Sequence, residues 1–125
     1  MTVREAYDIA LSLDQSTEPQ DESLFEHAVN LTNAWMSEVL ENENAIRYME
    51  HMAPFSAAPI LTKITDTVPY SDKLTRAALP FWIAHQLLKD DGDNVWAARY
   101  YDMYINSVDR ATPFMPTPSR DCWRW

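Results

Sequence analysis

The chain has 125 residues, of which 46% are hydrophobic and 23% charged; this is the size and composition of one globular domain and argues against general disorder. Its single glycine, Gly92, argues against folds that depend on glycine-rich turns, such as β-sandwiches and nucleotide-binding loops. Of the eight prolines, Pro19 stands alone, and the other seven fall between Pro54 and Pro80 and between Pro113 and Pro118. This distribution favours long helices joined by proline-marked segments.

The charge is strongly and unevenly negative. Ten Lys and Arg stand against 19 Asp and Glu, a net charge of −9. Residues 1–50 carry 11 acidic residues against Arg4 and Arg47 alone, whereas residues 51–125 are balanced. A protein that binds nucleic acid directly needs clustered Lys and Arg for the phosphates. We therefore expect a surface that repels DNA or meets a basic partner.

The single cysteine, Cys122, allows no disulfide within the chain, as is typical of a reducing compartment. The first residues lack the basic and apolar regions of a signal peptide, and no window approaches the roughly 18 consecutive apolar residues of a membrane span. We expect synthesis in a cytoplasm and no membrane association.

The first predicted helix covers residues 2–13. Thr2 and Glu5 match a capping box, and apolar residues follow at helical spacing from Val3 to Leu13. A polar connector over 14–21 leads to a second predicted helix over 22–41 with a wide apolar face. Residues 42–44 weaken that helix, and residues 45–52 add a short helical turn.

Residues 53–70 predict a long irregular loop with one short strand at most. Three prolines exclude a long helix, and β-branched residues favour extended backbone there. A helix over 71–89 with Pro80 inside it follows, then an acidic turn over 90–93 and a helix over 94–110. The predicted fold is all-α: a small bundle of about four helices with a helical domain over 1–111.

Residues 112–125 predict an extended tail. Pro113, Pro116 and Pro118 disfavour helix, yet the segment holds large apolar side chains that disordered tails normally lack. A stiff tail with aromatic anchors is typical of a segment that docks on another chain. The predicted docking residues are Phe114, Met115, Trp123 and Trp125.

The sequence contains no set of residues that we predict to be catalytic or to bind a cofactor or a metal ion. Around Gly92, the acidic turn fails as an EF-hand, because Leu87 and Ala98 would occupy ligand positions. The histidines His27, His51 and His85 do not have zinc-site spacing. Paired carboxylates on helices are usually solvated faces. We expect a protein that is not an enzyme and carries no cofactor or metal.

The order of the predicted elements resembles that of small bacteriophage head–tail connector proteins, also called adaptor or neck proteins. The resemblance covers roughly residues 2–110. It is carried by Thr2-Val3-Arg4-Glu5-Ala6-Tyr7, by Val68-Pro69-Tyr70-Ser71-Asp72-Lys73-Leu74, by Ala78-Leu79-Pro80, by Asp90-Asp91-Gly92-Asp93, and by Ala97, Tyr100 and Tyr104.

The resemblance implies a virion protein of the phage neck, made in the host cytoplasm. It implies a ring, commonly of twelve copies, that contacts the portal protein and the next neck or tail protein while DNA passes through without specific binding. For such a channel the candidate acidic surface is Glu22, Glu26, Glu38 and Glu41. Outward-facing acids that maintain solubility are an equal alternative. The alternative function is a small acidic cytoplasmic interaction or regulatory protein.

Overall fold

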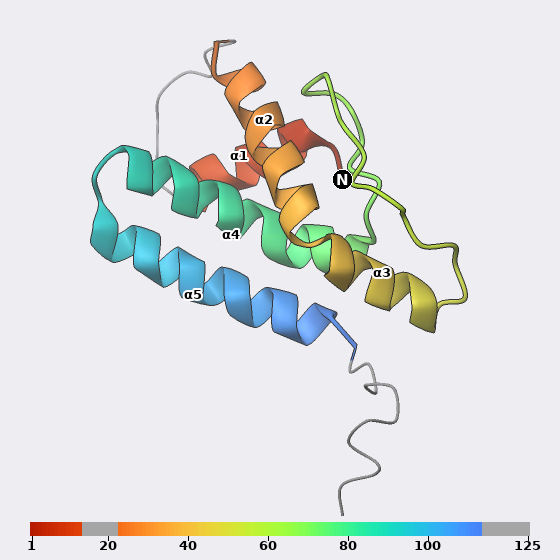
Figure 1. Ribbon diagram of the computed structural model, residues 1–125. Coiled ribbons are helices and arrows are strands. Elements are labelled where there is room, and N and C mark those ends of the chain that lie inside the picture. The colour runs from red at the N-terminus through yellow and green to blue at the C-terminus, as the bar shows by residue number, and fades with distance from the viewer. Residues whose placement is uncertain (14–22, 114–125) are drawn as a thin grey trace, which may run out of the picture.

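The computed structural model describes residues 1–13 and 23–113, and within these ranges it is all-α with no strand. The predicted fold class is confirmed. The only β-type pairing in the described residues is an isolated antiparallel bridge between Thr2 and Thr67. The helices are α1 (Val3–Leu13), α2 (Ser23–Glu38), α3 (Leu40–Met49), α4 (Asp72–Asp90) and α5 (Asn94–Ala111) (Figure 1).

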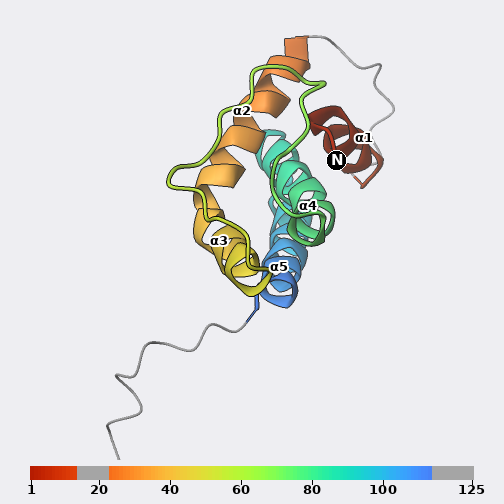
Figure 2. The ribbon, with the colours of Figure 1, turned by 90° about the vertical axis from the view of Figure 1, so that its right-hand side faces the viewer.

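Helices α4 and α5 form an antiparallel hairpin that is the base of the bundle (Figure 1). Gly92 turns the chain between them with φ +83°, a left-handed conformation that favours glycine. The Asp93 side chain then caps α5 by accepting the backbone N–H of Trp96 at 3.3 Å. Seen along the hairpin, α1 lies to one side of α4, and α2 and α3 lie to the other (Figure 2).

The first helix begins as the sequence predicts. The Thr2 hydroxyl accepts the backbone N–H of Glu5 at 3.2 Å, which satisfies one unpaired donor of the first turn. One face of α1 is then fully buried against the bundle, and its residues are Val3, Ala6, Tyr7 and Ala10. Burial of this apolar face fixes α1 on α4.

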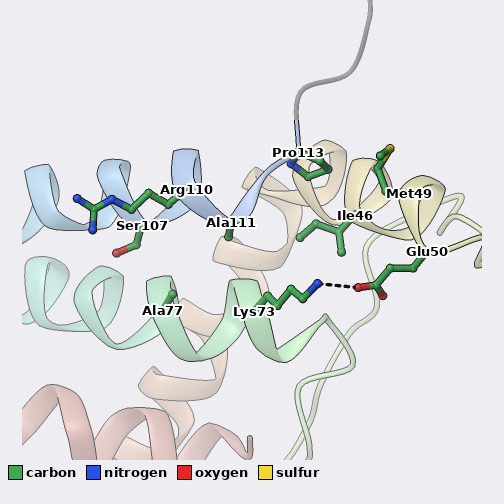
Figure 3. Close-up of a pocket in the computed structure, with 9 residues that line it drawn as sticks. All are labelled: Ile46, Met49, Glu50, Lys73, Ala77, Ser107, Arg110, Ala111 and Pro113. Carbon is green, nitrogen blue, oxygen red and sulfur yellow. Dashed lines mark hydrogen bonds and ion pairs between the residues drawn. The ribbon is translucent and has the colours of Figure 1, made fainter.

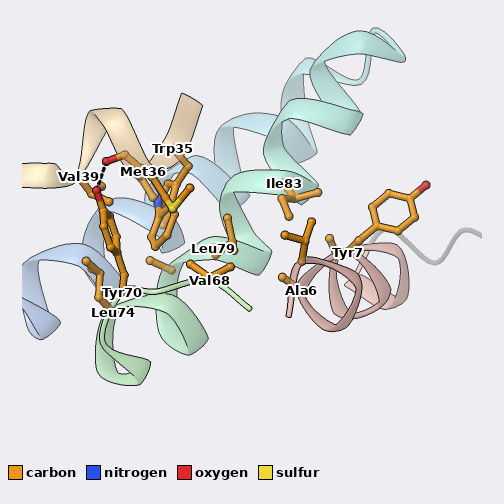
Figure 4. Packing of buried hydrophobic residues seen from close by; sticks show 14 of the residues in the cluster. Ala6, Tyr7, Trp35, Met36, Val39, Val68, Tyr70, Leu74, Leu79 and Ile83 are labelled. Carbon is orange, nitrogen blue, oxygen red and sulfur yellow. Dashed lines mark hydrogen bonds between the residues drawn. The ribbon is translucent and has the colours of Figure 1, made fainter. Parts of the chain in front are cut away.

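The core lies where α1, α2 and α4 meet and continues to α5 (Figure 4). Trp35 is its largest fully buried side chain, and Tyr70 packs against it with ring centroids 5.8 Å apart. The Tyr70 hydroxyl donates to the backbone oxygen of Met36 at 2.6 Å (Figure 4). Burial, reinforced by the nearby Glu43 carboxylate, raises the pKa of Tyr70 to about 12.

The predicted helix over 22–41 is corrected: α2 ends at Glu38, and a separate helix, α3, continues to Met49. Val39 separates the two helices with φ −102° and ψ 16°. Asn42 and Asn44 are weak helix formers, but in the structure residues 42–44 lie inside α3. Their side chains all have tertiary partners, namely Thr112 for Asn42, Ser71 for Glu43 and Phe55 for Asn44. Tertiary bonding therefore overrides intrinsic propensity.

Residues 53–70 form irregular backbone that contains no helix and no named strand. Two asparagines hold it, each through a pair of hydrogen bonds. The Asn33 amide donates to Leu61 O at 2.9 Å and accepts from Leu61 N at 2.8 Å, and Asn44 bonds Phe55 in the same way at 3.0 and 2.8 Å. Each amide thereby replaces the backbone partner that a neighbouring strand would provide.

Asp66 closes the turn at the far end of this loop. Its carboxylate accepts the backbone N–H groups of Thr62 and Lys63 at 3.0 and 2.9 Å. These hydrogen bonds, that from Thr62 first, hold the pKa of Asp66 below its ordinary value. The Asp66 backbone oxygen in turn accepts from Val3 N at 3.1 Å, so the turn also supports the start of α1.

Candidate functional site

Large apolar side chains are exposed at the C-terminal end of α3. Tyr48 is 66% exposed, Met49 54% and Met52 47%. We call Tyr48, Met49 and Met52 the α3 surface. One turn earlier in the helix, Ala45 and Ile46 are buried. Contiguous exposed apolar side chains typically mark an interaction site.

A hollow of about 570 Å³ lies beside this surface, where α3 meets α4 and α5 (Figure 3). Lys73 and Glu50 form an ion pair of 3.2 Å across it, from α4 to the end of α3. The wall is otherwise mostly apolar. We call this hollow the first hollow, and its lining residues are Ile46, Met49, Glu50, Lys73, Ala77, Ser107, Arg110, Ala111 and Pro113.

A second hollow of about 540 Å³ lies against the adjacent face of α3. The chain that follows α5 reaches both hollows, because Thr112 lines the second and Pro113 lines the first. The Thr112 hydroxyl accepts from the Asn42 side-chain amide at 2.9 Å and donates to Val108 O at 2.7 Å. The lining residues of the second hollow are Glu41, Asn42, Asn44, Ala45, Tyr48, Met52, Pro54 and Thr112.

A buried ionic group fixes α3 in this position. The Glu43 side chain is fully buried and accepts the Arg47 Nε–H at 2.9 Å. It also accepts the backbone N–H of Ser71 at 2.8 Å and the Ser71 hydroxyl at 3.2 Å, at the start of α4. The Arg47 guanidinium lies 3.9 Å from the centre of the Phe55 ring and donates to Pro69 O at 3.4 Å. One carboxylate therefore joins α3, α4 and the loop.

His51 ends α3 in an unusual way. It has φ +58°, the only positive φ of a residue other than glycine in the described ranges. The His51 N–H donates to Tyr48 O at 3.2 Å and the Met52 N–H to Arg47 O at 2.8 Å, the pattern of a helix C-terminus that usually places glycine here. The backbone turn sets the position of Met52 beside Tyr48 at the second hollow.

A third, shallower hollow of about 390 Å³ lies between α2, α4 and α5. His85 donates its Nδ1–H to Ala97 O at 2.9 Å, because a carbonyl can only accept, and its ring lies 5.0 Å from that of Tyr101. Glu38 and Lys89 bring one charge of each sign to the rim. His85 is a helix–helix packing residue.

Three of the four predicted acidic residues lie in the part of the chain that the structure describes. Glu26, Glu38 and Glu41 are exposed. Glu38 borders the third hollow and Glu41 the second, and these hollows share no lining residue. Glu22 and the predicted docking residues Phe114, Met115, Trp123 and Trp125 lie outside the described residues.

Sequence reasoning did not find Glu43, the hollows or the α3 surface. One signal was present: the polar run 41–44 between apolar residues, in which side chains on the buried face needed tertiary partners if the helix continued.

Within residues 1–13 and 23–113, no group of three His, Cys, Asp or Glu side chains could hold a metal ion. In the same part of the chain, every helix is too short or too polar to cross a membrane. Comparisons with family models, curated proteins and solved structures find no match to this chain.

Proposed function

We propose that this chain is a structural subunit of a bacteriophage neck, which assembles into a ring-shaped head–tail connector rather than acting as an enzyme. The observation that carries the proposal is the α3 surface, with its two hollows, at the point where the chain continues into an aromatic and proline-rich tail. A subunit that is built to assemble needs both an apolar receptor surface and apolar anchors.

The acidic charge is consistent with a channel through which DNA passes without being held. Each Lys or Arg that contacts a phosphate adds affinity through counterion release, so a wall of carboxylates lets DNA slide. Glu26, Glu38 and Glu41 are exposed and available for such a wall.

The second candidate function is a small acidic interaction or regulatory protein of the cytoplasm. The observation that favours it is the imbalance of residues 1–50, which carry 11 acidic residues against Arg4 and Arg47. A negative surface of this kind fits a basic partner. This alternative needs no closed oligomer.

The oligomeric state separates the two functions. Size-exclusion chromatography with light scattering gives the mass of the full chain, alone and mixed with a bacteriophage portal protein. A closed oligomer of many copies, formed alone or on the portal, supports the connector. A monomer or dimer that does not bind the portal supports the regulatory alternative.

Charge reversal tests the channel. The double variant E26K/E38K, at exposed positions outside the walls of both hollows beside α3, should still assemble, but particles carrying it should package or eject DNA more slowly, and more so at low salt, where screening is weakest. A matched control is the double reversal D102K/D109K at exposed positions on α5. Unchanged DNA transit in E26K/E38K particles would show that these acids maintain solubility only.

A further inference from the structure

We propose that the two hollows beside α3 are the docking site for Trp123 and Trp125 of a second copy of this chain. The inference rests on the proposed function, because it assumes that copies assemble. To that function the inference adds the surface on which the tail docks. It also states that the tail of one copy contacts the α3 side of the next copy.

The hollows fit large apolar side chains. The first hollow is lined by Ile46, Met49 and Ala77, and its volume of about 570 Å³ is within the range of sites that enclose a ligand. The second combines Tyr48 and Met52 in a hollow of about 540 Å³. Methionine sulfur and tyrosine rings both make favourable contacts with an indole ring.

Charge favours the same occupant. Glu41 is the charged residue in the wall of the second hollow, whereas in the first hollow Glu50 is paired with Lys73 and Arg110 adds a further cation. In the sequence, Arg120 and Arg124 flank Trp123, so the tail carries cations beside its aromatic anchors. The Glu41 carboxylate therefore favours the cationic tail at the second hollow and fixes its register there.

The position at which the tail begins indicates a second copy. Pro113 is already part of the wall of the first hollow, whereas Trp123 is ten residues further on. A backbone of the extended kind that Pro116 and Pro118 favour rises about 3.1 Å per residue, so ten residues of it would span roughly 30 Å. A segment of that length that starts at the wall of the hollow would place Trp123 beyond its own α3 and within reach of a neighbour.

Such a contact joins two different surfaces, because each copy gives a tail and receives one. An interface of this head-to-tail type forms a closed ring when the rotation between copies closes, and a filament when it does not. The inferred contact therefore has the geometry that a ring requires.

Complementation between two full-length variants tests the inference. W123A/W125A removes the anchors and keeps the hollows. A77R blocks the first hollow from an exposed helical position, where Arg is almost as compatible with helix as Ala. The matched control is A98R, at an exposed alanine of α5 outside the walls of both hollows. Circular dichroism checks that each variant keeps its helical content.

Light scattering should show that W123A/W125A and A77R each self-associate at least tenfold more weakly than the unmodified chain or A98R. An equimolar mixture of the two should form a two-chain complex, because one partner retains the tail and the other retains the hollows. Y48A, at the second hollow, should weaken association in the same direction.

Three results would overturn the inference: no association of the mixture, unchanged self-association of A77R and Y48A, or a monomeric unmodified chain. If the unmodified chain forms closed oligomers that none of these variants weakens, the connector function stands and only the assigned docking site is wrong. If the unmodified chain is monomeric and does not bind the portal protein, the proposed function fails as well.

Discussion

Glu43 and Arg47 lie one turn apart in α3, and their side chains form a 2.9 Å ion pair in which the carboxylate is fully buried and the guanidinium largely so. The pair does not stand alone. Ser71 donates two hydrogen bonds to the carboxylate, and Phe55 lies against the guanidinium. The position of the α3 surface therefore depends on the buried Glu43 carboxylate, which has no contact with solvent.

Removing this carboxylate should be costly. In E43A the Arg47 charge and the Ser71 N–H lose their main acceptor, and breaking a buried ion pair costs about 3–5 kcal/mol. We expect that loss in the free energy of unfolding, measured by urea denaturation. E41A, at an exposed position of the same helix, is the matched control and should change stability by less than about 0.5 kcal/mol. Equal losses in the two variants would contradict this role of Glu43.

The amide clamps should control the loop locally. N44A leaves the Phe55 N–H and C=O without their side-chain partner, at a cost of about 1–3 kcal/mol. We expect faster hydrogen exchange of the Phe55 amide, measured by NMR, while the Leu61 amide stays protected by Asn33. N106A, at an exposed position on α5, should leave both amides unchanged. Uniformly faster exchange in N44A would indicate global destabilisation instead.

Backbone conformation predicts opposite effects at two positions. His51 adopts φ +58°, which costs an L-residue roughly 1–2 kcal/mol, so H51G should be neutral or stabilising by up to about 1 kcal/mol. Gly92 has φ +83° with no atom within 4 Å of an added Cβ, so G92A meets backbone strain without a clash. We expect G92A to destabilise by about 1 kcal/mol. Thermal unfolding of both variants measures the difference, and a destabilised H51G would show that the histidine side chain has a role of its own.

Alkaline pH should weaken the fold through Tyr70. Its folded-state pKa is about 12, above the value of about 10 for an exposed tyrosine, so its contribution to stability is complete below pH 10 and is lost as pH rises through 12. The free energy of unfolding should fall less steeply with rising pH over this interval in Y70F than in the unmodified chain. Y48F, at an exposed tyrosine, is the control and should not alter the slope. If the free energy of unfolding fell equally steeply with pH in Y70F and in the unmodified chain, the raised pKa of Tyr70 would be contradicted.

Local signals in the sequence account for much of the fold. Thr2 and Glu5 predict the start of α1, and Gly92 with its acidic neighbours predicts the turn before α5, because capping and turn formation involve only nearby residues. The break at Val39 was not predictable in this way. It places Glu43 and Asn44 against Ser71 and Phe55, and those partners are distant in sequence. The two hollows beside α3 have the same origin, because the wall of the first combines α3, α4 and α5 and that of the second combines α3 with Met52, Pro54 and Thr112.

The hairpin of α4 and α5 has a consequence for how the chain folds. Its two helices are adjacent in sequence and make the most extensive packing in the molecule, so they can associate without closing a long loop. By contrast, the start of α1 joins the loop through Val3 N to Asp66 O and Arg4 N to Ile64 O, between segments far apart in the chain. Loop-closure entropy opposes such distant contacts until a nucleus exists. We expect the hairpin to form early, with the N-terminal segment docking last.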